Sequence, residues 1–377
     1  MKLGTILLSV TLLCLACKEK EPSLETLKKE AVEHYAALVL ASYDDAYQSA
    51  QALKTSIDAF VAAPSAAGLQ TCKEAWKAAR LPYGQTEAYR FYGGPIDDVD
   101  GPEGLLNSWP LDEAYIDYVQ GNPNSGIINN VSTYPTLDKA LLESLNQVGG
   151  ATEEQSEVNV ATGYHAIEFL LWGQDFNTAS PGDRAFTDYT TAANATRRGQ
   201  YLQLCAALLL EHLGQLRTEW QPGSAYYNTF TADPKSAIEK IFTGLGSLSK
   251  GELAGERMFV AVDSKDQENE HSCFSDNTHV DIQMNFEGIR NVYTGTYKRT
   301  DGSVLSGQSF AELATDLNST KATVLLEAFT EADAKIKAIP APFDQAILNS
   351  SDKILAASEA LKKLSDRIAD VQLELTR

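Results

Sequence analysis

The stretch GYHAIEFLLWGQD, residues 163–175, is an almost entirely apolar pattern that contains two side chains able to carry chemistry. A spacing of three places His165 and Glu168 on one face of an α-helix. Apolar residues surround the pair on all sides, which predicts a buried helix. Burying an ionised glutamate is costly unless a cation faces it or it holds a proton. The stretch therefore predicts a helical core with a polar site inside it.

Helical periodicity extends over most of the chain. Apolar residues recur at spacings of three and four, whereas alternation with a period of two hardly occurs, so the sequence predicts an all-α fold. Stretches rich in Gly, Pro, Asn and Asp predict loops over 93–150, with short helical pieces, and over 174–197. The predicted helices cover 24–61, 65–92 with a bend near Pro82 and Gly84, 152–172, 198–220, 234–262, a stretch after Ser275, and a long pair from 309 to the C-terminus.

The length of 377 residues exceeds what one small core needs and favours two domains. Two helical bundles in series are the economical arrangement for this pattern. We assign 31–190, which contains the His165 and Glu168 pair, to the first bundle and 191–377 to the second. Residues 17–30 are predicted to be a charged tether and the start of the first helix.

The first 16 residues have the features of a secretion leader. One lysine precedes an apolar run that is too short to span a bilayer, and the small Ala16 precedes Cys17. This ending resembles a bacterial lipoprotein signal, which implies that Cys17 is lipidated; a plain signal peptide cleaved nearby is the alternative. The prediction is a protein of the bacterial cell envelope, on the periplasmic face of the outer membrane or the cell surface, which contacts the membrane through the lipid anchor only.

The net charge and the spacing of the cysteines argue against a nucleic-acid-binding protein and against a cysteine zinc site. The formal net charge of −20 repels nucleic acid and concentrates cations, so no nucleic-acid partner is expected. Beyond the leader, the spacing of Cys72, Cys205 and Cys273 gives no zinc pattern, and we predict that they are buried small hydrophobes.

Three sequence blocks carry a family resemblance. GYHAIE at 163–168 resembles the Gly-x-His-x-x-Glu motif of the imelysin-like family. AWKAARLPYGQTEAYRFYGGPID at 75–97 and NEHSCFSDNTH at 269–279 are similar to the iron-regulated protein A branch of that family. The resemblance implies two helical bundles related by a pseudo-twofold axis, with the His/Glu motif near their interface.

The resemblance also implies peptidase activity, for which the sequence lacks the usual motifs. A zinc protease places two histidines and a glutamate on one helix, and the inverted form His-x-x-Glu-His would need histidine where Phe169 stands. No Gly-x-Ser-x-Gly nucleophile elbow occurs either. A metallopeptidase with Glu168 as ligand or general base stays the alternative function.

Metal binding without catalysis fits the same residues. One histidine with several carboxylates gives an oxygen-rich site that suits iron or manganese better than structural zinc. We predict His165 and Glu168 as ligands, and the resemblance implies that carboxylates of the second block, Glu87 and Asp97, join them. The expected ligand is a metal ion, iron above all, or an iron chelate. The expected role is iron uptake or handling, together with other envelope iron-uptake proteins. Supporting roles are assigned to Arg90, Asp276 and His279.

Each of these residues also has a structural interpretation. His165 and Glu168 satisfy one another if they form a core pair, and Glu87 with Arg90 forms an intrahelical ion pair. Asp97 can shape a turn, and Ser275 with Asp276 can cap a helix. On that interpretation the protein is an interaction module whose buried polar pair is structural.

Overall fold

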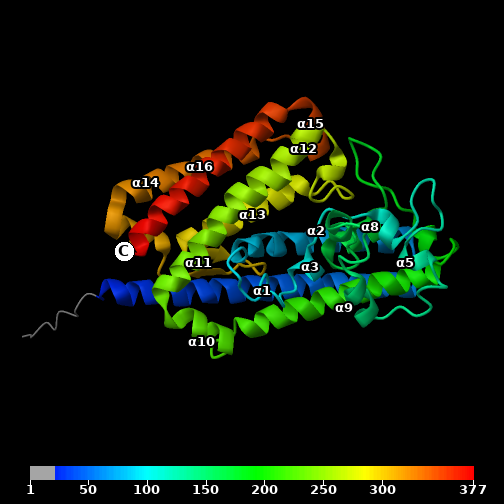
Figure 1. Cartoon of the computed structure of the whole chain (residues 1–377), viewed down its shortest axis with the longest axis horizontal. Helices are drawn as coiled ribbons and strands as arrows, with labels where there is room; N and C mark the ends of the chain where they lie inside the picture. Colours follow the sequence, from blue (N-terminus) through cyan, green and yellow to red (C-terminus); the bar gives the residue numbers. More distant parts are fainter. Residues whose placement is uncertain (1–21) are drawn as a thin grey trace, which may run out of the picture.

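The computed structural model describes residues 22–377 and confirms the all-α fold (Figure 1). The predicted leader and the lipidation site at Cys17 lie outside the described residues, so both stay predictions. The only strands found over 22–377 form a small antiparallel hairpin, β1 (Thr296–Lys298) and β2 (Val304–Ser306), which the sequence analysis did not predict.

Long helices are separated by short helical pieces and loops. In chain order the helical elements are α1 (Leu24–Ala62), α2 (Ala66–Thr86), η1 (Glu87–Tyr89), α3 (Glu103–Leu106), α4 (Glu113–Ile116), α5 (Gly126–Asn129), α6 (Lys139–Leu145), α7 (Glu153–Glu157), α8 (Gly163–Trp172), η2 (Phe186–Tyr189), α9 (Ala195–Glu219), α10 (Ala225–Ala232), α11 (Pro234–Ser247), η3 (Leu248–Phe259), α12 (Val260–Ser264), η4 (Gln267–Asn269), α13 (Thr278–Thr294), α14 (Phe310–Lys337), α15 (Phe343–Asn349) and α16 (Ser351–Leu375). Here η3 is a π-helical segment, continuous with α11 and α12.

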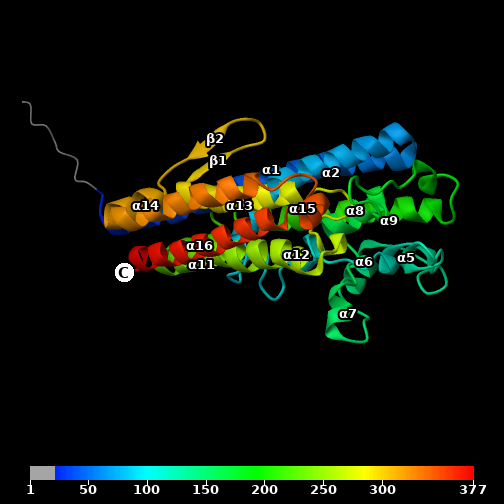
Figure 2. The same cartoon turned by 90° about the horizontal axis from the view of Figure 1, so that it is seen from above.

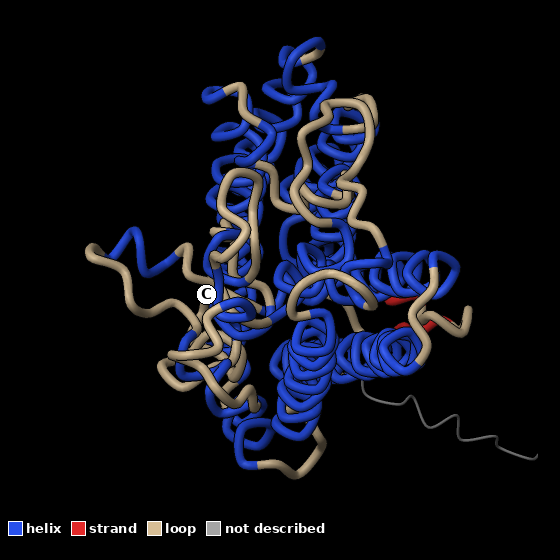
Figure 3. Tube along the Cα trace, turned by 90° about the vertical axis from the view of Figure 1, so that its right-hand side faces the viewer, coloured by secondary structure: helices blue, strands red, loops and turns tan. Residues whose placement is uncertain are grey.

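The longest helices run roughly along the long axis of the molecule (Figures 1 and 2). α1 packs against α2 and α9, while α16 packs against α14, η3 and α11. α13 joins these sets because it packs against α2 on one side and α14 on the other. The view along the long axis shows loops gathered at one end and the hairpin at the side (Figure 3). Apolar side chains from all of these helices form one continuous buried cluster. The boundary near residue 190 stays a prediction.

The predicted helix over 152–172 is interrupted in the structure. α7 ends at Glu157, and the chain is extended or irregular until α8 begins at Gly163. The backbone N–H groups of Ala161 and Thr162 donate to the side-chain oxygen of Asn146, at 2.8 and 3.3 Å, instead of to a preceding helical turn. The prediction of one continuous helix there was therefore wrong.

Two further boundaries differ from the sequence pattern. α2 ends at Thr86 rather than near residue 92, so that Glu87 lies in the short η1 turn; the positive φ of Phe91, 69°, stops any helix beyond it. α13 begins at Thr278, after Asn277, so neither Ser275 nor Asp276 is its N-cap.

The cysteine prediction is confirmed, because Cys72, Cys205 and Cys273 are all buried and free. Over residues 22–377, no helix combines the length and the apolarity that crossing a membrane requires.

Candidate functional site

α8 carries His165 and Glu168 into the interior, where they are 1% and 0% exposed. The Nδ1 atom of His165 lies 2.8 Å from Oε2 of Glu168. The other carboxyl oxygen, Oε1, accepts hydrogen bonds from the backbone N–H and the hydroxyl of Ser275, at 3.0 and 2.6 Å. Burial nevertheless raises the pKa of Glu168 to about 8, and the two bonds from Ser275 only moderate the rise. Near neutral pH a proton and hydrogen bonds, rather than a direct cation, therefore compensate the burial of this glutamate.

A second histidine with its own carboxylate lies beside the first. The rings of His165 and His271 pack edge to face with centroids 4.7 Å apart. Nδ1 of His271 lies 3.3 Å from Oδ2 of Asp281 on α13, closer than the 3.5 Å that separates it from the guanidinium of Arg80. The site therefore contains two histidine–carboxylate pairs from distant parts of the chain.

The Nε2 nitrogen of each imidazole has no hydrogen-bond partner among the described residues. Nε2 of His165 and Nε2 of His271 are both buried, and no group among residues 22–377 forms a hydrogen bond with either. Burial lowers the pKa of both rings well below the ordinary value, and nearby arginines, Arg80 for His165 and Arg257 for His271, lower it further. Neutral imidazoles held at Nδ1 by a carboxylate are typical of metal-binding histidines, whose Nε2 takes the ion.

The arginines of the site are paired with acids. Arg80 donates to Oδ1 of Asp281 at 3.1 Å and to Oδ1 of Asn107 at 2.5 Å. Burial by itself would raise the pKa of Asp281, but the Arg80 guanidinium and His271 bring it well below its usual range. The positive charge of Arg80 is thus balanced within the site.

Glu87 belongs to a neighbouring ion-pair network. Its Oε2 accepts from Arg90 at 2.6 Å and from Arg257 on η3 at 2.8 Å. Burial opposes ionisation, yet the two guanidinium groups bring the pKa of Glu87 down to about 2. Asn107 donates to Glu87 Oε1 at 3.4 Å and accepts from Arg80, so it connects this network to the histidines.

The remaining predicted residues occupy other positions. Asp97 accepts from the backbone N–H groups of Phe91 and Gly94, the latter at 2.9 Å, and so holds the turn after η1. Asp276 follows Ser275 with φ of 54° and has a buried, unpartnered oxygen, whereas His279 is half-buried on α13. The structure brings His165 and Glu168 together; it does not assemble Glu87 and Asp97 with them as one ligand cluster within residues 22–377. The ligand roles themselves stay predictions.

Sequence reasoning missed His271, Asp281, Arg80 and Arg257 as members of this site. Arg80 and His271 lie inside the two blocks that carried the resemblance, so a signal for both was present. The sequence contains no signal for Asp281 or Arg257, because each lies in an ordinary helical pattern and meets its partner only through tertiary packing.

Comparison with known proteins identifies the family. The imelysin family model, which carries a peptidase label, matches residues 39–371. The chain is 27% identical over 354 residues to iron-regulated protein A of Synechococcus elongatus, covering 90% of this chain and 84% of that protein. A solved structure described as an iron-regulated protein A precursor, from Parabacteroides distasonis, aligns with a TM-score of 0.73 at 20% identity, covering 95% and 97% of the two chains. An imelysin-like protein from Psychrobacter arcticum aligns with a TM-score of 0.66 at 15% identity, covering 94% and 96%.

Proposed function

Because the chain belongs to the imelysin family, we propose that it is an iron-handling protein that binds a metal ion through His165 and His271. The observation that carries the proposal is the pair of adjacent, buried imidazoles whose Nε2 atoms have no partner among the described residues. Imidazole nitrogen suits iron among other transition metals. The similarity to a protein named for iron regulation supports iron as the ion.

Glu168 and Asp281 take an orienting role in this proposal. Each lies against the Nδ1 atom of one histidine and so fixes the orientation of the ring, and the ionised Asp281 also increases the basicity of the opposite nitrogen of His271. This differs from a direct ligand role for Glu168, because both of its oxygens are already engaged. A metal ion held here is cargo, and the protein contributes the imidazoles and the buried, polar surroundings.

Iron titration of the purified protein under anaerobic conditions tests the proposal. We expect His165→Gln and His271→Gln each to lower the affinity for Fe²⁺ by ~10-fold or more, as loss of a ligand or its support does. His34→Gln is the matched control, since Nε2 of His34 is bonded to the Gly295 carbonyl at 2.8 Å, away from the site. Unchanged affinity in both site variants, with helical circular dichroism intact, would show that the pair is structural.

The peptidase alternative makes a different prediction. Two histidines and a glutamate are present in one site, but hydrolysis needs a metal position that a peptide can reach. Both imidazoles are only 1% exposed. We therefore expect no metal-dependent cleavage of unfolded casein by the purified protein. Cleavage by the wild type that disappears in Glu168→Gln would establish the peptidase instead.

Cell-envelope attachment is the final part of the proposal. We expect wild-type protein to remain with membranes in high salt, which removes only electrostatic association. Cys17→Ser should release it or leave its leader uncleaved, while Cys14→Ser should change neither. A Cys17→Ser protein that is cleaved and still membrane-bound would contradict lipidation at this residue.

A further inference from the structure

A second cluster of acidic side chains lies beyond the C-terminal end of α8. Asp175 follows α8, Glu270 and Asp276 lie in the segment between α12 and α13, and Asp344 lies in the first turn of α15. One oxygen from each of Asp175, Asp276 and Asp344 lies within 4.8 Å of the other two. All four side chains are buried, with Asp276 the most exposed at 8%.

Most carboxyl oxygens of the cluster have no donor among the described residues; Oδ1 of Asp175, which accepts from the backbone N–H of Asn177 at 2.8 Å, is an exception. Over residues 22–377, six buried oxygens have no hydrogen-bond partner: Oδ2 of Asp175, Oδ1 of Asp276, and both oxygens of Glu270 and of Asp344. No lysine, arginine or histidine forms an ion pair with any of the four within that part of the chain. Buried polar groups are normally satisfied, so this number of orphaned acceptors in one place indicates a missing partner.

Glu270 provides an observation that is independent of the cluster's composition. Its side chain is 0% exposed, and its carboxyl group faces that of Asp344. Asp175 and Asp276 face one another in the same way. An unpartnered acid thus points into a group of other acids, an arrangement that a bound cation or shared protons must relieve.

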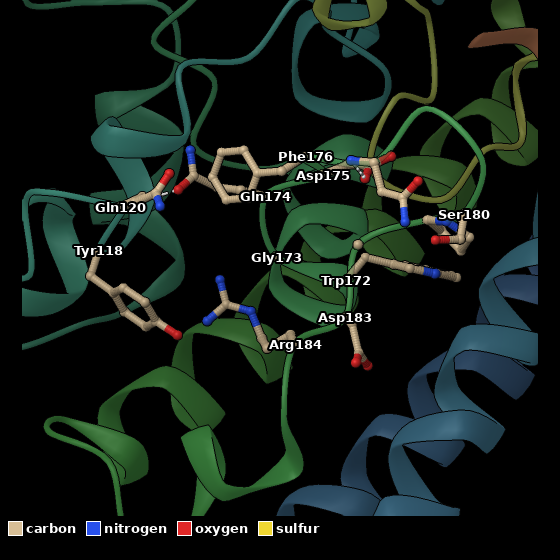
Figure 4. Close-up of a pocket in the computed structure, with 13 residues that line it drawn as sticks. Tyr118, Gln120, Trp172, Gly173, Gln174, Asp175, Phe176, Ser180, Asp183 and Arg184 are labelled. Atoms are coloured by element: carbon tan, nitrogen blue, oxygen red, sulfur yellow. Dashed lines mark hydrogen bonds between the residues drawn. The ribbon is translucent and has the colours of Figure 1, made fainter. Parts of the chain in front are cut away.

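Two cavities border the cluster. A cavity of about 340 Å³ is lined by Asp175 and Asp344, and the acids Asp266 and Glu268 also line it. A second cavity, of about 510 Å³, includes Asp175 in its wall (Figure 4). The wall of the smaller cavity contains four acids and one lysine, Lys265, so its net negative charge concentrates cations near the cluster.

We propose that Asp175, Asp276 and Asp344, with Glu270 beside Asp344, bind a hard divalent cation of the calcium class. Calcium takes six to eight oxygen ligands at roughly 2.4 Å, which places opposite ligands about 4.8 Å apart. The spacing of the three aspartate oxygens fits that requirement, and water molecules supply the remaining ligands of the ion. The absence of nitrogen and sulfur from the set separates it chemically from the histidine site.

A cation here ties together three segments that are distant in the sequence. It joins the loop that follows the His165 helix to α15 and to the loop that supplies Ser275 to Glu168. The ion would thus fix the position of Ser275, although it touches neither histidine. This role does not depend on the iron proposal.

Thermal unfolding with and without calcium tests the site. The full chain is treated with EDTA, dialysed, and unfolded with and without CaCl₂ at about 100 times its dissociation constant, determined by calorimetric titration. We expect the wild-type Tm to rise by on the order of 5 °C, with one calcium bound per chain. Asp344→Asn should raise Tm in EDTA, because it removes a carboxyl group that faces other acids, and Asp344→Asn and Glu270→Gln should each abolish most of the calcium-dependent rise.

Control variants show whether the calcium response comes from this cluster. Asp316→Asn changes an exposed acid on α14 and should respond to calcium like the wild type. His165→Gln and His271→Gln should also keep the full calcium response, which distinguishes failure here from failure of the iron proposal. If calcium raises the Tm of Asp344→Asn as much as that of the wild type, the proposed cation site is wrong. The site is also wrong if calcium does not change the Tm of the wild type while Asp344→Asn has a higher Tm than the wild type in EDTA. That result would show that the acids share protons instead.

Discussion

At Gly163 the backbone adopts φ of 88° where α8 begins, and a Cβ atom there would lie 2.6 Å from the carbonyl oxygen of Leu106. Side chains are disfavoured in this left-handed region, and the contact is too close for any Cβ. The glycine of the Gly-x-His-x-x-Glu motif therefore permits α8 to start against α3, which aims His165 and Glu168 inward. Its role is conformational.

We expect Gly163→Ala to lower the free energy of unfolding by about 1–3 kcal/mol, the usual cost of a strained backbone conformation. Gly251→Ala is the matched control, because Gly251 lies on η3 without a positive φ and a Cβ there would meet nothing within 4 Å. Urea unfolding of both variants measures the difference. Equal stability of the two would contradict the steric role of the motif glycine.

At the scale of elements, the region around α4, η2 and α9 is joined by one buried acid. Asp117, which ends α4 and is 0% exposed, accepts from Arg198 at 2.7 Å and from Arg184 at 2.8 Å. Burial by itself would raise its pKa, but the hydrogen bond from Arg198 and the charge of both guanidiniums lower the pKa below the ordinary value. Removing one partner from such a network leaves buried charges uncompensated.

Asp117→Asn should lower the free energy of unfolding by about 3–5 kcal/mol at neutral pH. A carboxylate whose folded pKa is depressed contributes stability above its unfolded pKa, about 3.9, and that stability is lost as the pH falls through the folded pKa. Urea unfolding of wild type and variant between pH 7 and pH 3 should therefore show a difference that shrinks on acidification. A difference that is constant with pH would show that Asp117 acts by packing alone.

The elements that were predicted well from the sequence are those that depend on local interactions and on a periodic pattern of apolar residues. α1 has an N-cap at Ser23 and a regular apolar stripe, and its predicted bounds agree with Leu24–Ala62 within one residue. The break before α8 was not predicted, because it depends on hydrogen bonds that the side chain of Asn146 accepts from backbone N–H groups of another segment. The hairpin β1–β2 was missed because its strands have three residues each, too few to show an alternating pattern.

At the scale of the whole molecule, the candidate site is predictable only in part. The pair His165 and Glu168 can be found from one helix, since a spacing of three puts both on one face. Its partners come from other segments, and Ser275 is 107 residues away from Glu168 in the sequence. Which of the other four histidines approaches His165 depends on how α13 packs against α2, a question that helical periodicity does not address.

Buried polar contacts cross the predicted boundary between the two bundles. Arg80 pairs with Asp281, Glu87 pairs with Arg257, and Glu168 accepts from Ser275, all in the interior. The apolar cluster is also continuous across residues 190 and 191. Independent unfolding of either part would expose both this apolar surface and unpaired charges, each at high cost. We therefore expect calorimetry to show one transition, with equal calorimetric and van't Hoff enthalpies.

A pair of variants tests whether these buried crossing contacts provide the coupling. Arg257→Gln removes a cation that is 1% exposed and leaves Glu87 with only Arg90, so it should lower Tm markedly and broaden or split the transition. Arg217→Gln removes a pair with Asp44 that also crosses the boundary, but both of these side chains are partly exposed, and such pairs contribute little. The Arg217→Gln variant should therefore still unfold in one sharp calorimetric transition. Two transitions in the wild type itself would mean that the bundles fold as separate units despite the shared site.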